Sequence, residues 1–154
     1  MKAYRERMWV PWYWWVLVLG LLASVWLALQ HAFGPAVALP ATGGIGALMA
    51  MALLRWGSAV VEVSGGGLRA GRAQLPFWAM GKVEALSGQA AREARGPQLR
   101  QTDYRFLRGY ISAVVRVEVI DPGDSTPTWV VSSRRPTELA TAIESGQAAQ
   151  SRQR

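Results

Sequence analysis

The side chains that could do chemistry in this sequence are few. There is one histidine, His31, and there is no cysteine. Thiolate nucleophiles, disulfides and cysteine-based zinc or iron–sulfur sites are therefore excluded. We interpret His31 as a solvated turn residue rather than a ligand. The sequence predicts no catalytic residue, no cofactor and no metal site.

Two motifs resemble parts of active sites but have simpler structural explanations. Ser64-Gly65-Gly66-Gly67 is glycine-rich, yet it lacks the Gly-Lys-Ser/Thr ending of a phosphate-binding loop. Asp121 and Asp124 lie close together, but they flank Pro122-Gly123, a strong turn signal. We therefore predict turns at both places and no enzymatic activity.

Basic residues are the other candidates for binding. The chain has 17 basic and 10 acidic residues, a net charge of +7, and the segment from Gly88 to Gly109 carries five arginines against two acidic residues. Such an excess suits anionic lipid headgroups or an acidic protein partner, although basic residues also accumulate on cytoplasmic faces for topological reasons. The arginines are scattered and no nucleic-acid-binding motif is present, so we expect no nucleic-acid partner. The candidate contacts are Arg92, Arg95, Arg100, Arg105, Arg108, Arg134 and Arg135.

Arg134 and Arg135 have a second reason to bind an anion. Pro136 predicts the first position of a helix, and helix N-termini attract phosphate. The alternative is that both arginines are solvated or pair with Glu138.

A long uncharged stretch interrupts this charge pattern. The 44 residues from Pro11 to Leu54 contain no Asp, Glu, Lys or Arg. A single helix of that length would measure about 66 Å, twice the bilayer core of about 30 Å. Gln30 to Pro35 provides the break, so we predict a hairpin of two spans, about 12–31 and 35–55. The rival interpretation is a signal peptide cleaved after Ala36-Val37-Ala38.

The flanks of the spans predict an orientation. Lys2, Arg5 and Arg7 precede the first span and Arg55 follows the second, whereas the turn between the spans has no basic residue. The positive-inside rule then places both termini in the cytoplasm of a multi-pass cell-membrane protein. Tryptophans at the same two ends fit an interfacial belt: Trp9, Trp12, Trp14, Trp15 and Trp56.

Small residues recur within both spans. Gly20, Ser24 and Ala28 repeat at every fourth position of the first span, and Gly43 and Ala47 do so in the second. Small faces let helix backbones approach closely. We expect them to pack the hairpin, with dimerisation through the same faces as the alternative.

The remaining two-thirds of the chain alternates like a β-rich domain. Ile111 to Ile120 gives the clearest strand, with alternate positions apolar. A final helix begins at Pro136 and is predicted to end at Gly146. Further strands are expected at 59–63, 68–75, 78–86 and 128–132, with a short helix at 90–95 in an otherwise irregular basic segment.

Two separated motifs resemble those of an actinobacterial membrane family of unknown function, DUF3093. One is Tyr4-Arg5-Glu6-Arg7-Met8-Trp9-Val10-Pro11-Trp12-Tyr13-Trp14-Trp15. The other begins at Asp121-Pro122 and continues as Thr126-Pro127-Thr128-Trp129-Val130-Val131-Ser132-Ser133-Arg134-Arg135-Pro136. Arg108-Gly109-Tyr110 before the valine-rich strand adds to the resemblance. It implies two spans and a soluble β-rich domain, and it implies no reaction.

These observations predict an α+β membrane protein. Residues 1–56 would form the transmembrane hairpin, residues 57–146 a cytoplasmic pleckstrin-homology-like (PH-like) β-rich domain with a C-terminal helix, and residues 147–154 a flexible tail. The expected function is that of a membrane-tethered binding module for anionic lipid or a protein partner. The alternative is an accessory subunit that docks in a larger membrane complex through its spans.

Overall fold

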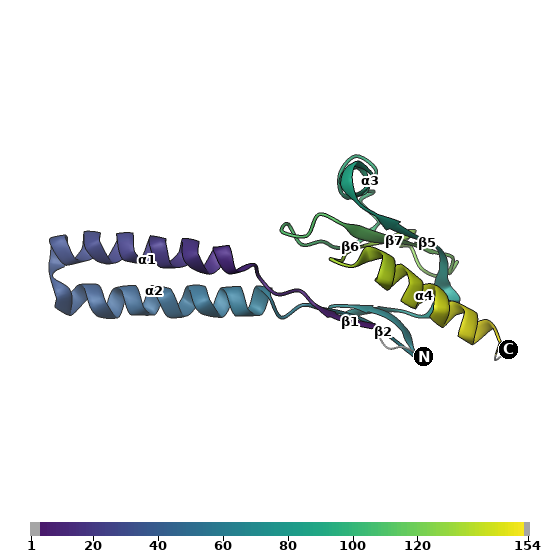
Figure 1. The fold of residues 1–154 in the computed structure, drawn as a ribbon, viewed down its shortest axis with the longest axis horizontal. Helices are drawn as coiled ribbons and strands as arrows, with labels where there is room; N and C mark the ends of the chain where they lie inside the picture. Colours follow the sequence, from purple (N-terminus) through teal and green to yellow (C-terminus); the bar gives the residue numbers. More distant parts are fainter. Residues whose placement is uncertain (1–3, 153–154) are drawn as a thin grey trace. The chain divides into compact units, whose positions relative to one another are not determined.

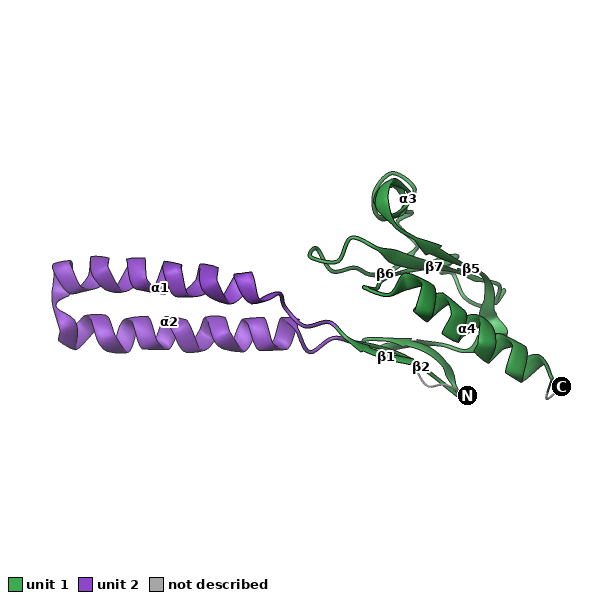
Figure 2. Ribbon diagram, in the orientation of Figure 1, with its two compact units in different colours: residues 1–7, 60–154 green, residues 8–59 purple. Residues whose placement is uncertain are grey.

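The computed structural model describes residues 4–152, which form two compact units. Residues 8–59 make the helical unit, while the residues up to Arg7 and those from Val60 onward together make the β-rich unit (Figure 2). The fold is thus α+β, as the sequence predicts.

The helical unit is a hairpin of two helices, α1 (Trp12–Phe33) and α2 (Pro35–Trp56). Gly34 adopts a φ of 75°, which a residue without a Cβ adopts at little cost, and Pro35 then starts the second helix. Each helix has 22 residues, or about 33 Å, and is long and apolar enough to cross a membrane. The predicted break is confirmed. His31 lies in the last turn of α1 rather than in the connecting turn, because the helix continues to Phe33.

The N-terminal residues correct the expected domain boundary. Tyr4–Arg7 form strand β1, which pairs antiparallel with β2 (Val60–Ser64), from Tyr4 opposite Val63 to Arg7 opposite Val60 (Figure 1). Residues 4–7 therefore belong to the β-rich unit, and the helical hairpin is an insertion between two neighbouring strands. Charged residues in this short segment concealed its alternation of buried and exposed positions. Lys2 lies outside the described residues.

The first sheet has the order β1-β2-β3-β4, all antiparallel. The predicted strand 68–75 is in fact two strands, β3 (Gly67–Ala70) and β4 (Ala73–Leu75). They are separated at Gly71, whose φ of 64° reverses the chain. The predicted turn at residues 64–67 is confirmed as the connection from β2 to β3.

The second sheet has the order β5-β7-β8-β6. Its antiparallel strands are β5 (Met80–Leu86), β7 (Val114–Val119) and β8 (Thr128–Ser132). The expected strand at 78–86 begins later, because the short 3-10 helix η1 (Phe77–Ala79) precedes it. The strand expected from Ile111 also begins three residues later.

Strand β6 (Tyr104–Phe106) was not predicted, because it lies in the segment expected to be irregular. It pairs in parallel with β8 and forms one edge of the second sheet. The segment also contains the expected short helix, α3 (Gly88–Arg95), in which Ala91 and Ala94 pack against Val114 and Val130.

Helix α4 (Pro136–Ser151) contacts strands of both sheets and completes the core of the β-rich unit (Figure 1). It begins at Pro136 as predicted, but it does not end at Gly146. Gly146 is buried, and a Cβ there would overlap the ring of Phe77. This glycine is therefore a site of close packing rather than a helix stop, and the expected tail is helical through Ser151. Buried side chains from β2, β3, β7, β8 and α4 form the core: Val61, Val63, Leu68, Val115, Val117, Val131, Leu139 and Ile143.

Candidate functional site

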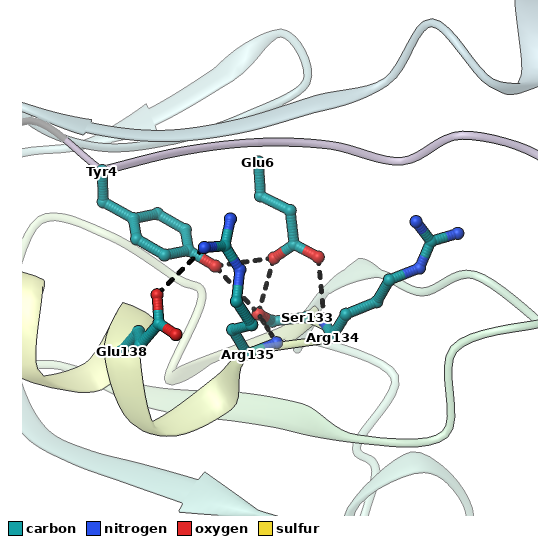
Figure 3. A network of polar contacts seen from close by, with 6 residues as sticks. All are labelled: Tyr4, Glu6, Ser133, Arg134, Arg135 and Glu138. Atoms are coloured by element: carbon teal, nitrogen blue, oxygen red, sulfur yellow. Dashed lines mark hydrogen bonds and ion pairs between the residues drawn. The ribbon is translucent and has the colours of Figure 1, made fainter.

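Two polar clusters stand out in the β-rich unit, and the first surrounds Glu6 on β1. Its carboxylate accepts hydrogen bonds from Tyr4 Oη at 2.7 Å, from Ser133 Oγ at 2.7 Å and from the Arg134 backbone N–H at 2.9 Å (Figure 3). Glu6 is 5% exposed and Ser133 is fully buried. We call these four residues the Glu6 cluster. It joins β1 to the turn between β8 and α4, more than 120 residues later in the chain.

The electrostatics of the cluster keep its donors in place. A phenol is protonated at neutral pH and can donate to Glu6, and burial raises the pKa of Tyr4 further, from 10.0 to about 12. Arg135 lies over the Tyr4 ring at 5.5 Å and pairs with Glu138 at 3.1 Å. The Arg135 backbone N–H also donates to Ser133 Oγ. Arg135 therefore helps to hold the start of α4 as well as carrying charge at the surface.

Sequence reasoning missed Glu6 and Ser133 as a pair. A signal was present, because both residues lie in the two separated motifs that carried the family resemblance. Only the folded chain shows that these motifs meet.

The second cluster lies along a groove on the second sheet, with a volume of about 690 Å³. We call it the charged groove. Strands β5 and β7 supply Lys82, Glu84, Arg116 and Glu118, and the connection from α3 to β6 supplies a further wall. The other lining residues are Ala94, Pro97, Gln98, Leu99, Arg100, Asp103, Pro127, Thr128 and Val130.

Charges on the sheet side of the groove are partly paired. Lys82 Nζ lies 2.7 Å from Glu84 Oε1, and this bond raises the pKa of Lys82 and lowers that of Glu84. Arg116 is held more loosely, at 3.9 Å from Glu84 and 3.4 Å from Gln98 Oε1.

Asp103 is the unusual member of the wall. The residue is only 9% exposed. One carboxylate oxygen, Oδ2, accepts the Arg100 backbone N–H at 2.7 Å. The other, Oδ1, is buried and has no hydrogen-bond partner among residues 4–152.

The predicted basic residues separate into two groups. Arg95 donates to the backbone carbonyls of Ile111 at 2.8 Å and Arg108 at 3.1 Å, and Arg108 lies over the Phe106 ring at 5.0 Å. These two arginines hold the segment between α3 and β7 in place. The exposed members are Arg92, Arg100, Arg105, Arg134 and Arg135.

The small residues of the helices do not pack the hairpin as we expected. Gly20, Ser24, Ala28, Gly43 and Ala47 are all exposed, and a Cβ added at Gly20 or Gly43 would meet nothing within 4 Å.

Other positions meet between α1 and α2, and on α2 they include the small residue Gly46; Ala38 of the same helix is fully buried. Leu22 approaches Gly46 closely, and Trp14 packs edge-on against Trp56 at 5.6 Å. The interface thus combines bulky side chains with the small residue Gly46, and the five small residues named above lie outside it.

The remaining candidates have structural roles. Asp121 and Asp124 each accept a backbone N–H two residues ahead, at 2.9 and 2.8 Å, which confirms the predicted turn. No group of three or more acidic or histidine side chains suited to a metal ion occurs in the described part of the chain.

Glu6→Ala is expected to destabilise the β-rich unit by about 3 kcal/mol, because three donors lose their buried acceptor. Thermal or denaturant unfolding of the full chain in nonionic detergent measures the effect. Arg5→Ala, on the exposed face of the same strand, is the matched control and should cost less than about 0.5 kcal/mol. Equal stabilities of the two variants would contradict the role assigned to Glu6.

Comparisons with known proteins complete the description of these sites. No curated protein and no solved structure matches the chain. The model of the family described as "Protein of unknown function (DUF3093)" matches residues 3–143 of the 154 residues, which include both the Glu6 cluster and the charged groove. The chain therefore belongs to the DUF3093 family.

Proposed function

We propose that α1 and α2 anchor the protein in a membrane and that the β-rich unit is a non-enzymatic binding module. One observation carries the anchoring. The described structure buries no residue of α1 and only Ala38 and Leu53 of α2. A pair of core helices in a water-soluble protein would bury its apolar side chains, whereas the apolar side chains of α1 and α2 remain exposed.

The energetic argument is simple. Leu17, Leu19 and Leu48 are each more than 60% exposed. Leaving one large apolar side chain in water instead of an apolar medium costs about 1.5–3 kcal/mol. Apart from Arg55 at the end of α2, neither helix carries Asp, Glu, Lys or Arg, and a lipid environment removes the cost of their exposed apolar side chains.

An orientation with both termini in the cytoplasm is part of the proposal. Arg5 and Arg7 precede α1 and Arg55 ends α2, while the connection at Gly34 has no basic residue. Trp9, Trp12 and Trp56 are exposed near the same two helix ends, where an interfacial belt would lie.

Single-cysteine labelling tests this topology without background, because the chain has no native cysteine. Ala32→Cys, near the connection, should react with an impermeant maleimide in intact cells. Ser125→Cys, in an exposed loop of the β-rich unit, should react only after permeabilisation.

Labelling of both sites, or of neither, in intact cells would contradict the hairpin with its ends inside. An N-terminal epitope tag should persist in the mature protein, and its loss would indicate signal-peptide cleavage instead.

Exposed arginines support anionic lipid as the partner of the binding module. Arg92 on α3 and Arg105 on the edge strand β6 are exposed, and so is Arg134 before α4. Arg95 and Arg108 are largely engaged within the fold, so they contribute less to a surface contact. A C-terminal helix covering β-sheets is also the plan we expected for a PH-like domain.

Flotation with vesicles tests the lipid contact. The full chain is held in nanodiscs of neutral lipid. It should float more with vesicles that contain phosphatidylglycerol than with phosphatidylcholine vesicles, and added salt should weaken its binding to the phosphatidylglycerol vesicles. Each basic residue near an anionic surface contributes about 1 kcal/mol, so Arg92→Gln with Arg105→Gln should reduce binding about 30-fold.

Arg69→Gln with Arg72→Gln is the matched control, since both arginines are exposed on the β3–β4 hairpin. Equal retention on the two kinds of vesicle, or none on either, would rule out selective binding of anionic lipid.

A second candidate function is that of an accessory subunit in a larger membrane complex. The observation in its favour is that Gly20, Ser24 and Ala28 form an exposed face of small residues. Ser24 Oγ bonds back to the Gly20 carbonyl at 3.0 Å, so it adds little bulk to this face. A second helix could approach it closely.

Gly20→Leu with Ala28→Leu should release a partner captured by cross-linking in native membranes, because the added side chains would separate the backbones. Ala36→Leu, at an exposed position of α2, should leave the cross-link intact. An uncross-linked monomer for the unmodified chain, or an unchanged cross-link in the double variant, would count against docking through this face.

A further inference from the structure

We propose that the charged groove binds a small zwitterionic ligand, with an ammonium group on Asp103 and an acidic group on Arg116. This site is separate from the proposed contact with anionic lipid. The lipid contact was assigned to other residues, Arg92, Arg105 and Arg134, so each proposal can be tested without the other.

Asp103 provides the first half of the argument. Its Oδ1 is buried in the groove wall without a partner among the described residues, while Oδ2 is occupied by the Arg100 backbone N–H. A buried acceptor that lacks a donor has lost its hydration without compensation, and this cost is greater when the group is charged. A ligand with N–H groups would supply the missing donor, and a positively charged one would do so best.

Arg116 provides the second half. Its guanidinium has five N–H donors, and it makes a long hydrogen bond to Gln98 Oε1 at 3.4 Å and a loose ion pair with Glu84 at 3.9 Å. Lys82, by contrast, is held at 2.7 Å by Glu84. Arg116 is thus the strand cation with the most capacity to receive a carboxylate or phosphate.

The balance of charge selects a zwitterion over a simple ion. Three basic side chains (Lys82, Arg100, Arg116) and three acidic ones (Glu84, Asp103, Glu118) line the groove. A pure cation would face Arg116, and a pure anion would face Asp103. A molecule that carries both charges can pair with both residues, which is electrostatic complementarity without net charge.

The size and remaining lining of the groove fit such a ligand. A volume of about 690 Å³ lies within the range of about 300–1,000 Å³ typical of small-molecule sites. Leu99 and Val130 offer apolar contact for a short aliphatic linker. Phosphoethanolamine has this chemistry, either as a free compound or as a lipid headgroup.

Calorimetry on the full chain in nonionic detergent tests the proposal with phosphoethanolamine as the probe. Ethanolamine and inorganic phosphate are its two halves, and each should bind at least 10-fold more weakly than the whole. Equal affinity for the probe and either half, or no binding of the probe, would overturn the proposal.

Two variants locate the site. Asp103→Asn keeps an acceptor for the Arg100 N–H but replaces the unpartnered Oδ1 by an amide donor, so affinity should fall at least 10-fold. Arg116→Gln should do the same by removing the cation. Asp124→Asn and Arg69→Gln, which change the same groups outside the groove, should bind as the unmodified chain does.

Unfolding temperature shows whether each variant is folded. If Asp103→Asn does not fold, Arg116→Gln decides alone. Unchanged affinity in either folded groove variant contradicts the assignment.

The source of the ligand is tested with lipids. Phosphatidylethanolamine can donate N–H groups to Asp103, whereas the trimethylammonium of phosphatidylcholine cannot. Selective retention of phosphatidylethanolamine by the unmodified chain, lost in Asp103→Asn, indicates a headgroup. Binding of phosphoethanolamine without such lipid selectivity indicates a free ligand.

Discussion

The hydrogen bonds to Glu6 are the interaction on which the β-rich unit depends most. One carboxylate links the first described strand to the turn that starts the last helix. A buried carboxylate is costly unless donors surround it, and here two hydroxyl groups and a backbone N–H do so. The link joins residues more than 120 positions apart, so a contact distant in sequence completes the unit.

This arrangement changes how the chain should be divided. The helical hairpin does not precede the domain but is inserted between β1 and β2, whose residues Arg7 and Val60 are paired. A fragment that begins after α2 would lack β1 and would leave Ser133 and the Arg134 N–H without their acceptor. The β-rich unit is therefore best studied in the full chain.

The arginines show why residue type alone does not identify a binding surface. Arg95 uses its guanidinium to satisfy backbone carbonyls in a segment with little regular structure. Such carbonyls need partners when they are removed from water, and a planar group with several donors supplies them. Arg105 likewise donates to the Arg100 carbonyl, and Arg135 pairs with Glu138. Composition therefore overstates the surface available to an anionic partner.

Some features followed from the sequence alone. The uncharged stretch, its break at Gly34-Pro35, the strand at Thr128–Ser132 and the helix beginning at Pro136 all depend on local chemistry. Hydrophobic periodicity, the fixed φ of proline and the conformational freedom of glycine act over a few residues. They can therefore be recognised in the sequence without knowledge of the fold. The family resemblance also came from the sequence, because each of its motifs is one unbroken run of residues.

Other features were decided only by tertiary structure. Strand β1 is too short and too charged to be recognised before its partner β2 is known. Gly146 resembles a helix stop until Phe77 is seen to occupy the space beside it. The Asp103 oxygen that lacks a partner among residues 4–152 and the outward small faces of the helices depend on what surrounds each side chain. Pairing, close packing and burial join residues distant in sequence, which is why local patterns did not reveal them.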